Sequence, residues 1–520
     1  MKFKVFYSPV ILAASAALSG TIIYTAYYPV SHRFAIVAGL ALLFFIIRAA
    51  SLSKYVFFYG LIAGIFYFTP LLWFVKFVSL TAACILIFYQ ACFIGVFSIL
   101  AKKISERHRL YGIFFYPFLW VSVEYIRSSG NMGFPWMLAG NVFDGGAGFS
   151  WLAAYGGVCL ISFYLVLLAC IAVFLFEKKA RLSLRFIVIA GAIISFLLLY
   201  RELPDGRGNK FSGDYIKIAL IQPSIPQNTK WDGNSKDYIL ERYRDLTVNA
   251  ALRFPELIIW PESSLPGIIP DNEEMEEFIQ SVSSQINTAL LIGIQTSRYE
   301  NGEKRYFNSA VLYSEKGEKI QSYDKRQLVP FGEYVPLSKV FYFLKNLSPI
   351  GEGFSRGLSH GVFDLQDASS RVSGPCKFGV TICYEDLFPS ISRGYVSKGA
   401  DFIVNITNDA WYGYTSAPFL HALSSSMRCI ENDVPMLRCT NTGLTCFIDR
   451  SGIITRVAGS SKGILFQPDI LFVELKMDEI TKNTGTFYNK TGDLIVYVSF
   501  VVLVCLITKT KIHNLLGRRI

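Results

Sequence analysis

Charged residues are scarce in this chain. They make up 17% of the 520 residues, whereas a soluble domain is about a quarter charged. Hydrophobic residues reach 52%, and the mean hydropathy is +0.38. A shortage of charge together with a positive mean hydropathy argues against an ordinary soluble enzyme and indicates several membrane spans. The chain is also too long for one ordinary soluble domain and fits two.

The cysteines and histidines lack the spacing of a metal site. No CxxC pair occurs among the ten cysteines, and no two of the five histidines are spaced as in HExxH. We therefore expect no metal and no cofactor. Half of the cysteines lie in apolar runs, where a cysteine behaves as a small hydrophobe. The others, in the more polar part of the chain, are Cys376, Cys383, Cys429, Cys439 and Cys446.

Basic residues outnumber acidic ones, but they do not form a stripe suited to nucleic acid. The formal net charge is +11, and the basic residues cluster beside apolar runs, at 102–109 and again at 178–185. In membrane proteins such clusters mark the cytoplasmic side. We therefore expect no nucleic-acid partner.

Apolar stretches of spanning length occur near 9–29, 55–75, 79–101, 110–126, 150–176, 184–200 and 492–508. The shorter run 34–47 also counts as a span, because the basic clusters then share one side and Arg33, Lys76 and Arg127 fall in the opposite loops. The sequence thus predicts eight spans. About seven form a transmembrane domain at 1–205, the last is a helix at 491–509, and a cytoplasmic tail follows at 510–520. Both termini are expected in the cytoplasm.

The same charge count places residues 213–485 on the outer side of the membrane, where they read as a soluble α/β domain. Runs rich in β-branched residues predict strands, with amphipathic helices near 236–252 and 272–286. The predicted strands are Tyr215–Gln222, 257–260, 289–295, 309–313, 378–383, 401–407 and 471–475.

Three segments of this domain carry residues with catalytic chemistry. A hydrophobic strand runs directly into Glu262, and another delivers Cys383 to a turn. Between them a stiff loop with two prolines and a glycine carries Lys325 and Glu333. Ligands of α/β proteins bind at the carboxyl ends of strands, and a nucleophile commonly sits at a strand-to-helix elbow. Taken singly, each segment also has an ordinary interpretation: Glu262 as an exposed loop glutamate, the loop as a surface loop with solvated charges, and Cys383 as a buried core cysteine.

Taken together, the order Glu, Lys, Cys and its flanking residues resemble the nitrilase superfamily. Spans on both sides of the domain resemble, more narrowly, the apolipoprotein N-acyltransferase family across nearly the whole chain. The flanks that carry the resemblance are Trp260-Pro261-Glu262, Pro330-Phe331-Gly332-Glu333, Cys383-Tyr384-Glu385 and Asn408-Asp409-Ala410-Trp411-Tyr412-Gly413. Further local matches are Phe134-Pro135-Trp136, Gln227-Asn228-Thr229-Lys230-Trp231, Phe307-Asn308-Ser309 and Arg438-Cys439-Thr440-Asn441-Thr442-Gly443.

The resemblance implies an α-β-β-α sandwich on the periplasmic side of a bacterial inner membrane. It also implies acyl transfer from a membrane phospholipid, through a thioester on Cys383, to the α-amine of an apolipoprotein's amino-terminal diacylglyceryl-cysteine. Glu262, Lys325 and Cys383 would form the triad. Supporting roles fall to Glu333, Tyr384 and Glu385, and substrate binding to Trp231, Phe341, Phe343 and Trp411. Nothing in the sequence indicates more than a monomer.

The roles of the triad can also be argued from the residue types. A free thiol has a pKa of about 8.5, so Cys383 needs a base or a nearby cation. Glu262 can take the thiol proton, while Lys325 stabilises the negative charge that develops on the acyl oxygen. The backbone N–H of Tyr384 is a natural second donor. A disulfide to Cys376 would block this chemistry, so we expect Cys383 to be a free thiol.

The sequence leaves other functions open. A membrane-anchored amidase or nitrilase-type hydrolase would use the same triad but let water attack the thioester, and a lipid carrier would only bind. His421 suggests a protease-like Cys–His pair, although Glu262 and Lys325 already supply the base and the cation. The apolar segment 340–344 is expected to be either a lid at the membrane surface or a core helix.

Overall fold

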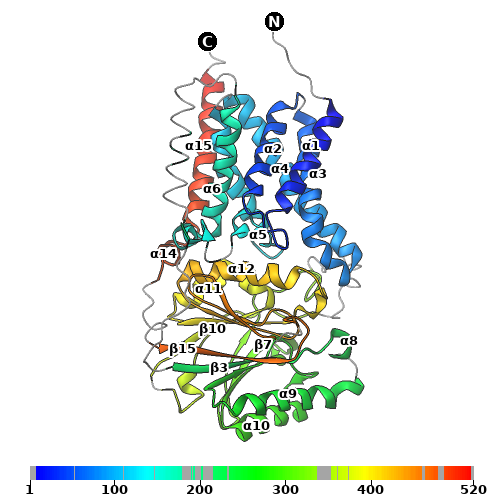
Figure 1. Ribbon diagram of the computed structural model, residues 1–520, viewed down its shortest axis with the longest axis vertical. Coiled ribbons are helices and arrows are strands. Elements are labelled where there is room, and N and C mark those ends of the chain that lie inside the picture. Colours follow the sequence, from blue (N-terminus) through cyan, green and yellow to red (C-terminus); the bar gives the residue numbers. More distant parts are fainter. Residues whose placement is uncertain are drawn as a thin grey trace. The chain divides into compact units, whose positions relative to one another are not determined.

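A computed structural model of the chain (Figure 1) divides into two compact units. The first comprises Met1–Leu203, Thr415–Leu420 and Thr491–Ile520, and the second Pro204–Tyr414 and His421–Lys490. The described residues are 8–51, 53–108, 111–143, 145, 147–177, 189, 191, 193, 201–202, 215–230, 233–335, 353–359, 361–372, 374–459, 463–477 and 485–516.

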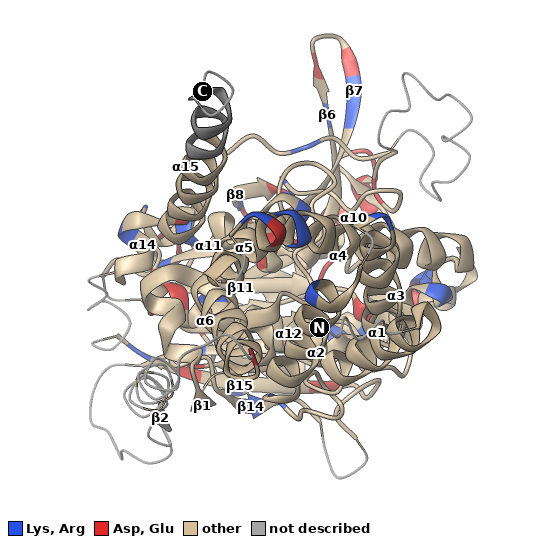
Figure 2. Cartoon of the chain, turned by 90° about the horizontal axis from the view of Figure 1, so that it is seen from above, with Lys and Arg blue, Asp and Glu red and all other residues tan. Residues whose placement is uncertain are grey.

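The first unit is built mainly from helices. They are α1 (Pro9–Tyr24), α2 (Ala35–Ala49), α3 (Ser53–Leu72), α4 (Leu80–His108), α5 (Tyr116–Ser128), α6 (Ala153–Leu175) and α15 (Leu494–Leu516). Helix α1 starts at Pro9, whose missing N–H costs nothing there, and Ser8 caps it by accepting from the Val10 N–H at 3.3 Å. Helices α1 and α6 contain no charged residue (Figure 2).

Three segments are long and apolar enough to cross a membrane: Ser53–Phe77, Leu80–His108 and Ser150–Leu175. Three further apolar helices are shorter, namely Pro9–Tyr24, Ala35–Ala49 and Leu494–Thr508. The expected span at 184–200 falls almost wholly outside the described residues. The count of eight spans therefore stays a prediction.

Arg127 does not lie in a loop, as the charge count assumed, but in the last turn of α5. Its guanidinium is buried and donates to the Gln90 Oε1 at 2.8 Å, the Met137 carbonyl at 2.8 Å and the Trp136 carbonyl at 3.1 Å. A guanidinium carries five N–H donors and can be buried only where acceptors meet it. This arginine therefore ties the segment after α5 to the helices.

The second unit contains two sheets. The larger runs in the order β15-β3-β4-β6-β7-β8, with β5 paired to β6, and the smaller in the order β14-β13-β12-β11-β10-β9. The larger sheet is formed by β3 (Tyr215–Gln222), β4 (Leu257–Ile259), β5 (Ile268–Ile269), β6 (Ala289–Glu300), β7 (Glu303–Tyr313), β8 (Lys319–Asp324) and β15 (Asp469–Lys476). The smaller is formed by β9 (Val362–Asp364), β10 (Lys377–Ile382), β11 (Phe402–Thr407), β12 (Met436–Thr440), β13 (Cys446–Ile448) and β14 (Ile454–Val457).

The two sheets pack face to face with helices outside them. Strand β12 meets the larger sheet, and the Cys439 Sγ lies 3.3 Å from the carbonyl oxygens of both Ile221 and Ile259. On the outer face of the larger sheet, α9 (Lys236–Ala251) and α10 (Glu273–Ile286) bury Tyr243 and Phe278 against Trp260. Helices α11 (Pro389–Val396) and α12 (Ala417–Asn432) lie beside the smaller sheet (Figure 1). The predicted α-β-β-α sandwich is confirmed.

Within this sandwich, Gly379 of β10 allows α11 to approach the sheet closely. A Cβ added at Gly379 would lie 2.3 Å from the Tyr395 Cγ. The ring has little room to move away, because the Tyr395 hydroxyl donates to the Val380 carbonyl at 2.6 Å.

We expect Gly379→Ala to lower the free energy of unfolding by about 1–3 kcal/mol, because the added methyl overpacks this contact. Thermal denaturation of the detergent-solubilised protein would measure the change. Gly361→Ala is the matched control, since a Cβ there meets its nearest neighbour at 3.4 Å, an ordinary contact. Equal melting temperatures for Gly379→Ala and the wild type would contradict this account of the packing.

Candidate active site

Lys325 lies buried between two carboxylates. Its Nζ is 2.8 Å from the Glu333 Oε1 and 3.3 Å from the Glu262 Oε1, and only 1% of the residue is exposed. Burial would lower the pKa of this amine, but the negative charges of Glu333 and Glu262 outweigh it and raise the pKa well above the usual value. Lys325 is therefore a fixed cation at neutral pH.

Asn308 of β7 holds the same two carboxylates together. Its Nδ2 donates to the Glu262 Oε1 at 2.8 Å and to the Glu333 Oε1 at 3.0 Å. The second oxygen of Glu262 accepts from the Asn408 N–H at 2.9 Å, and that of Glu333 from the Val329 N–H at 2.9 Å. Every carboxylate oxygen thus has a donor, as buried charges require.

Cys383 follows the last residue of β10 and begins a turn of 3-10 helix, Cys383–Leu387. Its φ of +53° lies in the left-handed region, which a non-glycine side chain enters at a cost of roughly 1–3 kcal/mol. Strain of this kind is typical of a nucleophile elbow. All ten cysteines are free thiols, as was predicted for Cys383.

Burial is the main reason that the pKa of the Cys383 thiol is raised well above its usual value. The charge of Glu262 raises it further, whereas Lys325 lowers it. The thiol is therefore protonated at rest, and a base must take its proton during the reaction. The charges of Glu262 and Lys325 both act on the thiol, so the three predicted triad residues belong to one site.

Glu385 and Tyr384 lie in the turn that Cys383 begins. Glu385 is fully buried and accepts from the Arg326 N–H at 2.6 Å, the Gln327 N–H at 3.0 Å and the Tyr323 hydroxyl at 2.9 Å. It therefore fastens the loop after Lys325 to the nucleophile turn. The Tyr384 side chain is buried, and its ring packs edge-on against Phe388 at 5.1 Å between centroids.

No role was predicted from the sequence for two features of the site, although Lys230 stands in one of the local matches to the family. Lys230 is buried, and its Nζ lies 3.3 Å from the Glu262 carbonyl oxygen. Burial lowers the pKa of this amine to about 8, although Glu262 opposes the shift. A Cβ on Gly293 of β6 would lie 2.7 Å from the Glu262 Cα, so this glycine leaves room for the backbone of Glu262.

Of the four residues predicted to bind substrate, only Trp411 is among the described residues. Trp231, Phe341 and Phe343 lie outside the described residues, and so does the segment 340–344 for which a lid or a core helix was expected. Trp411 is 40% exposed at the end of β11, in the short helix Asp409–Tyr412. Among the described residues, no group of three His, Cys, Asp or Glu side chains is placed to hold a metal ion.

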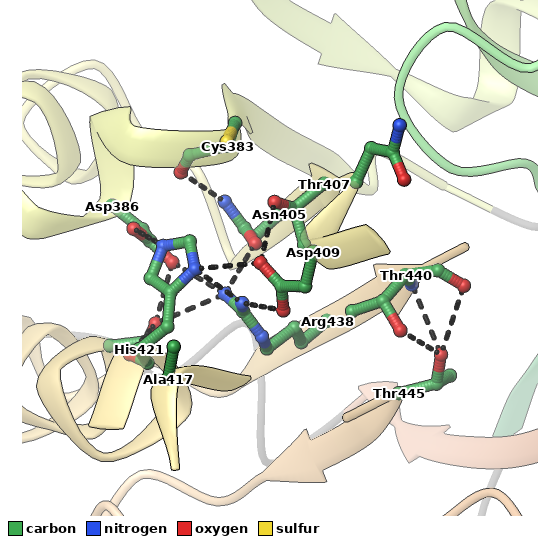
Figure 3. Close-up of polar contacts among 12 residues, drawn as sticks. Cys383, Asp386, Asn405, Thr407, Asp409, Ala417, His421, Arg438, Thr440 and Thr445 are labelled. Carbon is green, nitrogen blue, oxygen red and sulfur yellow. Dashed lines mark hydrogen bonds and ion pairs between the residues drawn. The ribbon is translucent and has the colours of Figure 1, made fainter. Parts of the chain in front are cut away.

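A network of buried charged side chains lies next to Cys383 (Figure 3). Arg438 of β12 is fully buried and contacts the Asp386 Oδ2 at 2.8 Å and the Asp409 Oδ2 at 3.1 Å. His421 of α12 bridges the same two residues, from Nε2 to the Asp386 Oδ1 at 2.9 Å and from Nδ1 to the Asp409 Oδ1 at 3.1 Å. His421 is therefore held by this network and does not form the Cys–His arrangement considered above.

The charges of the network explain the protonation of His421. Burial and the nearby Arg438 lower its pKa, but Asp386 and Asp409 together raise it above the usual value. Burial opposes ionisation of both aspartates as well, yet His421 and Arg438 hold the pKa of each below its usual value. The two aspartates thus favour the protonated form of His421, although it lies beside the guanidinium of Arg438.

We expect part of the stability to depend on the charge of His421. Because its folded pKa is raised, the stabilisation is complete below the unfolded value of about 6.5 and is lost as the pH rises through the higher folded value. As the pH rises above about 6.5, the melting temperature of the wild type should therefore fall more steeply than that of His421→Gln.

Thermal denaturation at a series of pH values checks this. The exposed His32, replaced as His32→Gln, is the control and should follow the wild type. Parallel curves for His421→Gln and the wild type would contradict the raised pKa of His421.

Known proteins match both units. Residues 217–482 match the family described as Carbon-nitrogen hydrolase, and residues 19–171 match the Apolipoprotein N-acyltransferase N-terminal domain. An apolipoprotein N-acyltransferase of Geobacter metallireducens is 32% identical, with 84% of this chain and 82% of the relative covered. One of Chlorobaculum tepidum is 29% identical, with 82% of each covered.

A crystal structure of an amidase from Nesterenkonia sp. is also similar to this chain. It is 19% identical with a TM-score of 0.38, and the similarity covers 53% of this chain and 96% of the amidase. The matches to the curated relatives extend over both units. The chain belongs to the apolipoprotein N-acyltransferase family, and a carbon-nitrogen hydrolase domain forms most of its second unit.

Proposed function

We propose that this protein transfers a fatty acyl chain from a membrane phospholipid to the α-amino group of the amino-terminal diacylglyceryl-cysteine of apolipoproteins. The observation that carries the proposal is the position of Cys383, at a strained elbow within the electrostatic reach of Glu262 and Lys325, in a chain of this family. The reaction would proceed in two steps through a thioester on Cys383.

In the first step, the Glu262 carboxylate takes the proton from the Cys383 Sγ as the sulfur attacks the ester carbonyl of the phospholipid. The ammonium of Lys325 and the Tyr384 N–H stabilise the oxygen anion of the tetrahedral intermediate. When the intermediate collapses, the C–O bond breaks and the leaving alkoxide takes the proton from Glu262. The products are a lysophospholipid and an acyl group bound to sulfur.

In the second step, the neutral α-amine of the lipoprotein attacks the thioester carbonyl. The same donors stabilise the second intermediate, and Glu262 receives a proton from the attacking nitrogen. The C–S bond then breaks, and Glu262 returns this proton to the sulfur, which leaves an amide and a free thiol. One site thus serves two substrates in turn, which is a ping-pong scheme.

Glu333 supports the triad through Lys325. It is the closer of the two carboxylates to the Lys325 Nζ, at 2.8 Å against 3.3 Å for Glu262. Since Lys325 is bound more closely by Glu333, Glu262 is the carboxylate that is available for proton transfer. We infer that Glu333 positions the cation and that Glu262 acts as the base.

We further propose that the helical unit lies in the bacterial inner membrane, with both termini in the cytoplasm and the catalytic domain in the periplasm. The three long apolar helices and the basic clusters beside the apolar runs support this topology. Both substrates are lipids, so a catalytic domain linked to membrane helices has access to them.

We expect the purified protein to gain the mass of one acyl chain when it is incubated with phospholipid. Hydroxylamine should remove the adduct, because it cleaves thioesters, and Cys383→Ala should never form it. Cys376→Ala removes a buried thiol seven positions earlier and should keep the adduct. Intact-mass spectrometry provides the measurement. An unmodified wild-type protein, or an adduct that survives in Cys383→Ala, would rule out this step.

The acceptor can be tested on the acylated protein. A diacylated lipopeptide with a free amino terminus should discharge the thioester and gain the acyl group as an amide. The same lipopeptide with an acetylated amino terminus is the matched control and should leave the adduct in place. If the adduct instead decays at one rate whether or not the amine is present, water is the acceptor and the protein is a hydrolase.

A further inference from the structure

Asn405 of β11 connects the buried charge network to the nucleophile (Figure 3). Its Nδ2 donates to the carbonyl oxygen of Cys383 at 3.1 Å, and its Oδ1 accepts from the Arg438 Nη1 at 2.7 Å. The side chain is fully buried, so both contacts are shielded from water.

Arg438 determines which way the amide of Asn405 points. A guanidinium carries only donors, so the oxygen of the amide must face it. The Nδ2 group must then face the opposite direction, toward the Cys383 carbonyl and the Thr381 Oγ1, also at 3.1 Å. A rotated amide would set two donors against each other on one side and two oxygens on the other. The orientation of Asn405 is therefore fixed by charge.

The Cys383 carbonyl belongs to the same peptide unit as the Tyr384 N–H. This unit is planar, and it is trans because it is not among the cis bonds of the chain. Carbonyl and N–H therefore point in opposite directions, and a hydrogen bond that fixes one also fixes the other. Without such a contact, the peptide that follows a strained φ of +53° could rotate more easily.

We infer that Asn405 is a positioning residue for acyl transfer, because it aims the Tyr384 N–H at the oxygen anion of the tetrahedral intermediate. This inference rests on the proposed function only in the role that it gives to Tyr384. Arg438 acts one step further away, by holding Asn405. Its other partners, Asp386 and Asp409, belong to the nucleophile turn and to the segment beside Asn408, which donates to Glu262.

A purely structural Asn405 would have a different effect on reactivity. If it only filled and stabilised the interior, its loss would displace the thiol and slow every reaction of Cys383. If it aims an N–H at an oxygen anion, its loss would slow only reactions that form such an anion. Attack on an ester forms one, whereas alkylation by iodoacetamide is a direct displacement and does not.

The test compares these two reactions of Cys383 in the full-length protein in detergent. Acylation by p-nitrophenyl butyrate is followed by the release of p-nitrophenolate and by intact mass, and alkylation by iodoacetamide by mass alone. Asn405→Asp keeps the size of the side chain but replaces the donor by an oxygen. We expect its acylation rate to fall about 10- to 100-fold, less than the loss of a whole oxyanion donor, and its alkylation rate to stay within about threefold.

Asn405→Ala is the second variant and should behave in the same way, since it removes the donor without adding charge. Asn432→Ala is the matched control, because Asn432 is equally buried and donates to the Arg428 carbonyl at 2.9 Å. It should keep both rates.

Either of two results would overturn the inference. One is wild-type acylation in both Asn405 variants. The other is a parallel loss of acylation and alkylation, or of both together with the folded state, which would make Asn405 a structural residue. If the wild type reacts with the nitrophenyl ester but never with phospholipid, the proposed donor fails while the role of Asn405 is still decided by the same comparison.

Discussion

The site depends on one buried cation that is shared by two carboxylates. Lys325 lies between Glu262 and Glu333, and Asn308 donates to the same two oxygens from the neighbouring strand. Removing a charge from water is costly unless partners compensate it, so the segments that carry these residues must come together for the domain to fold. The same arrangement leaves Lys325 as a permanent positive charge beside the thiol. Stability and catalysis therefore place the same demand on these side chains.

Much of the catalytic domain could be predicted from the pattern of its strands. Runs rich in β-branched residues predicted Tyr215–Gln222 with its observed bounds and β4, β10, β11 and β15 to within two residues. The strands predicted at 289–295 and 309–313 are shorter than β6 and β7, which extend to Glu300 and start at Glu303. Strands β5, β8, β9, β12, β13 and β14 were missed, and most of them are short. Strand β12 also carries Arg438, whose burial depends on its ion pairs with Asp386 and Asp409. The helical unit was harder to predict from the sequence. Arg127 has the sequence context of a charged loop residue, and only its contacts with backbone carbonyls explain why it is buried at the end of a helix.

The proposed triad was accessible from the sequence, but the contacts that support it were not. Glu262, Lys325 and Cys383 carry recognisable chemistry at strand ends, and their flanks resemble a known superfamily. Asn308 and Lys230 stand in local matches to the family and Asn405 in a predicted strand, but no role was predicted for any of them from the sequence. An asparagine or a lysine acquires a role here only through burial next to a particular partner. Gly293 is likewise meaningful only once the backbone of Glu262 is seen beside it.

Glu385 accepts from the N–H groups of Arg326 and Gln327, and it also accepts from the Ile382 N–H at 2.9 Å. The cation and the nucleophile are therefore parts of one rigid frame. A frame of this kind cannot adapt to an alcohol leaving in one half-reaction and an amine arriving in the next. The discrimination between two lipids must then be made by surfaces that surround the frame, so substrate range could change in evolution while the reaction centre stays the same.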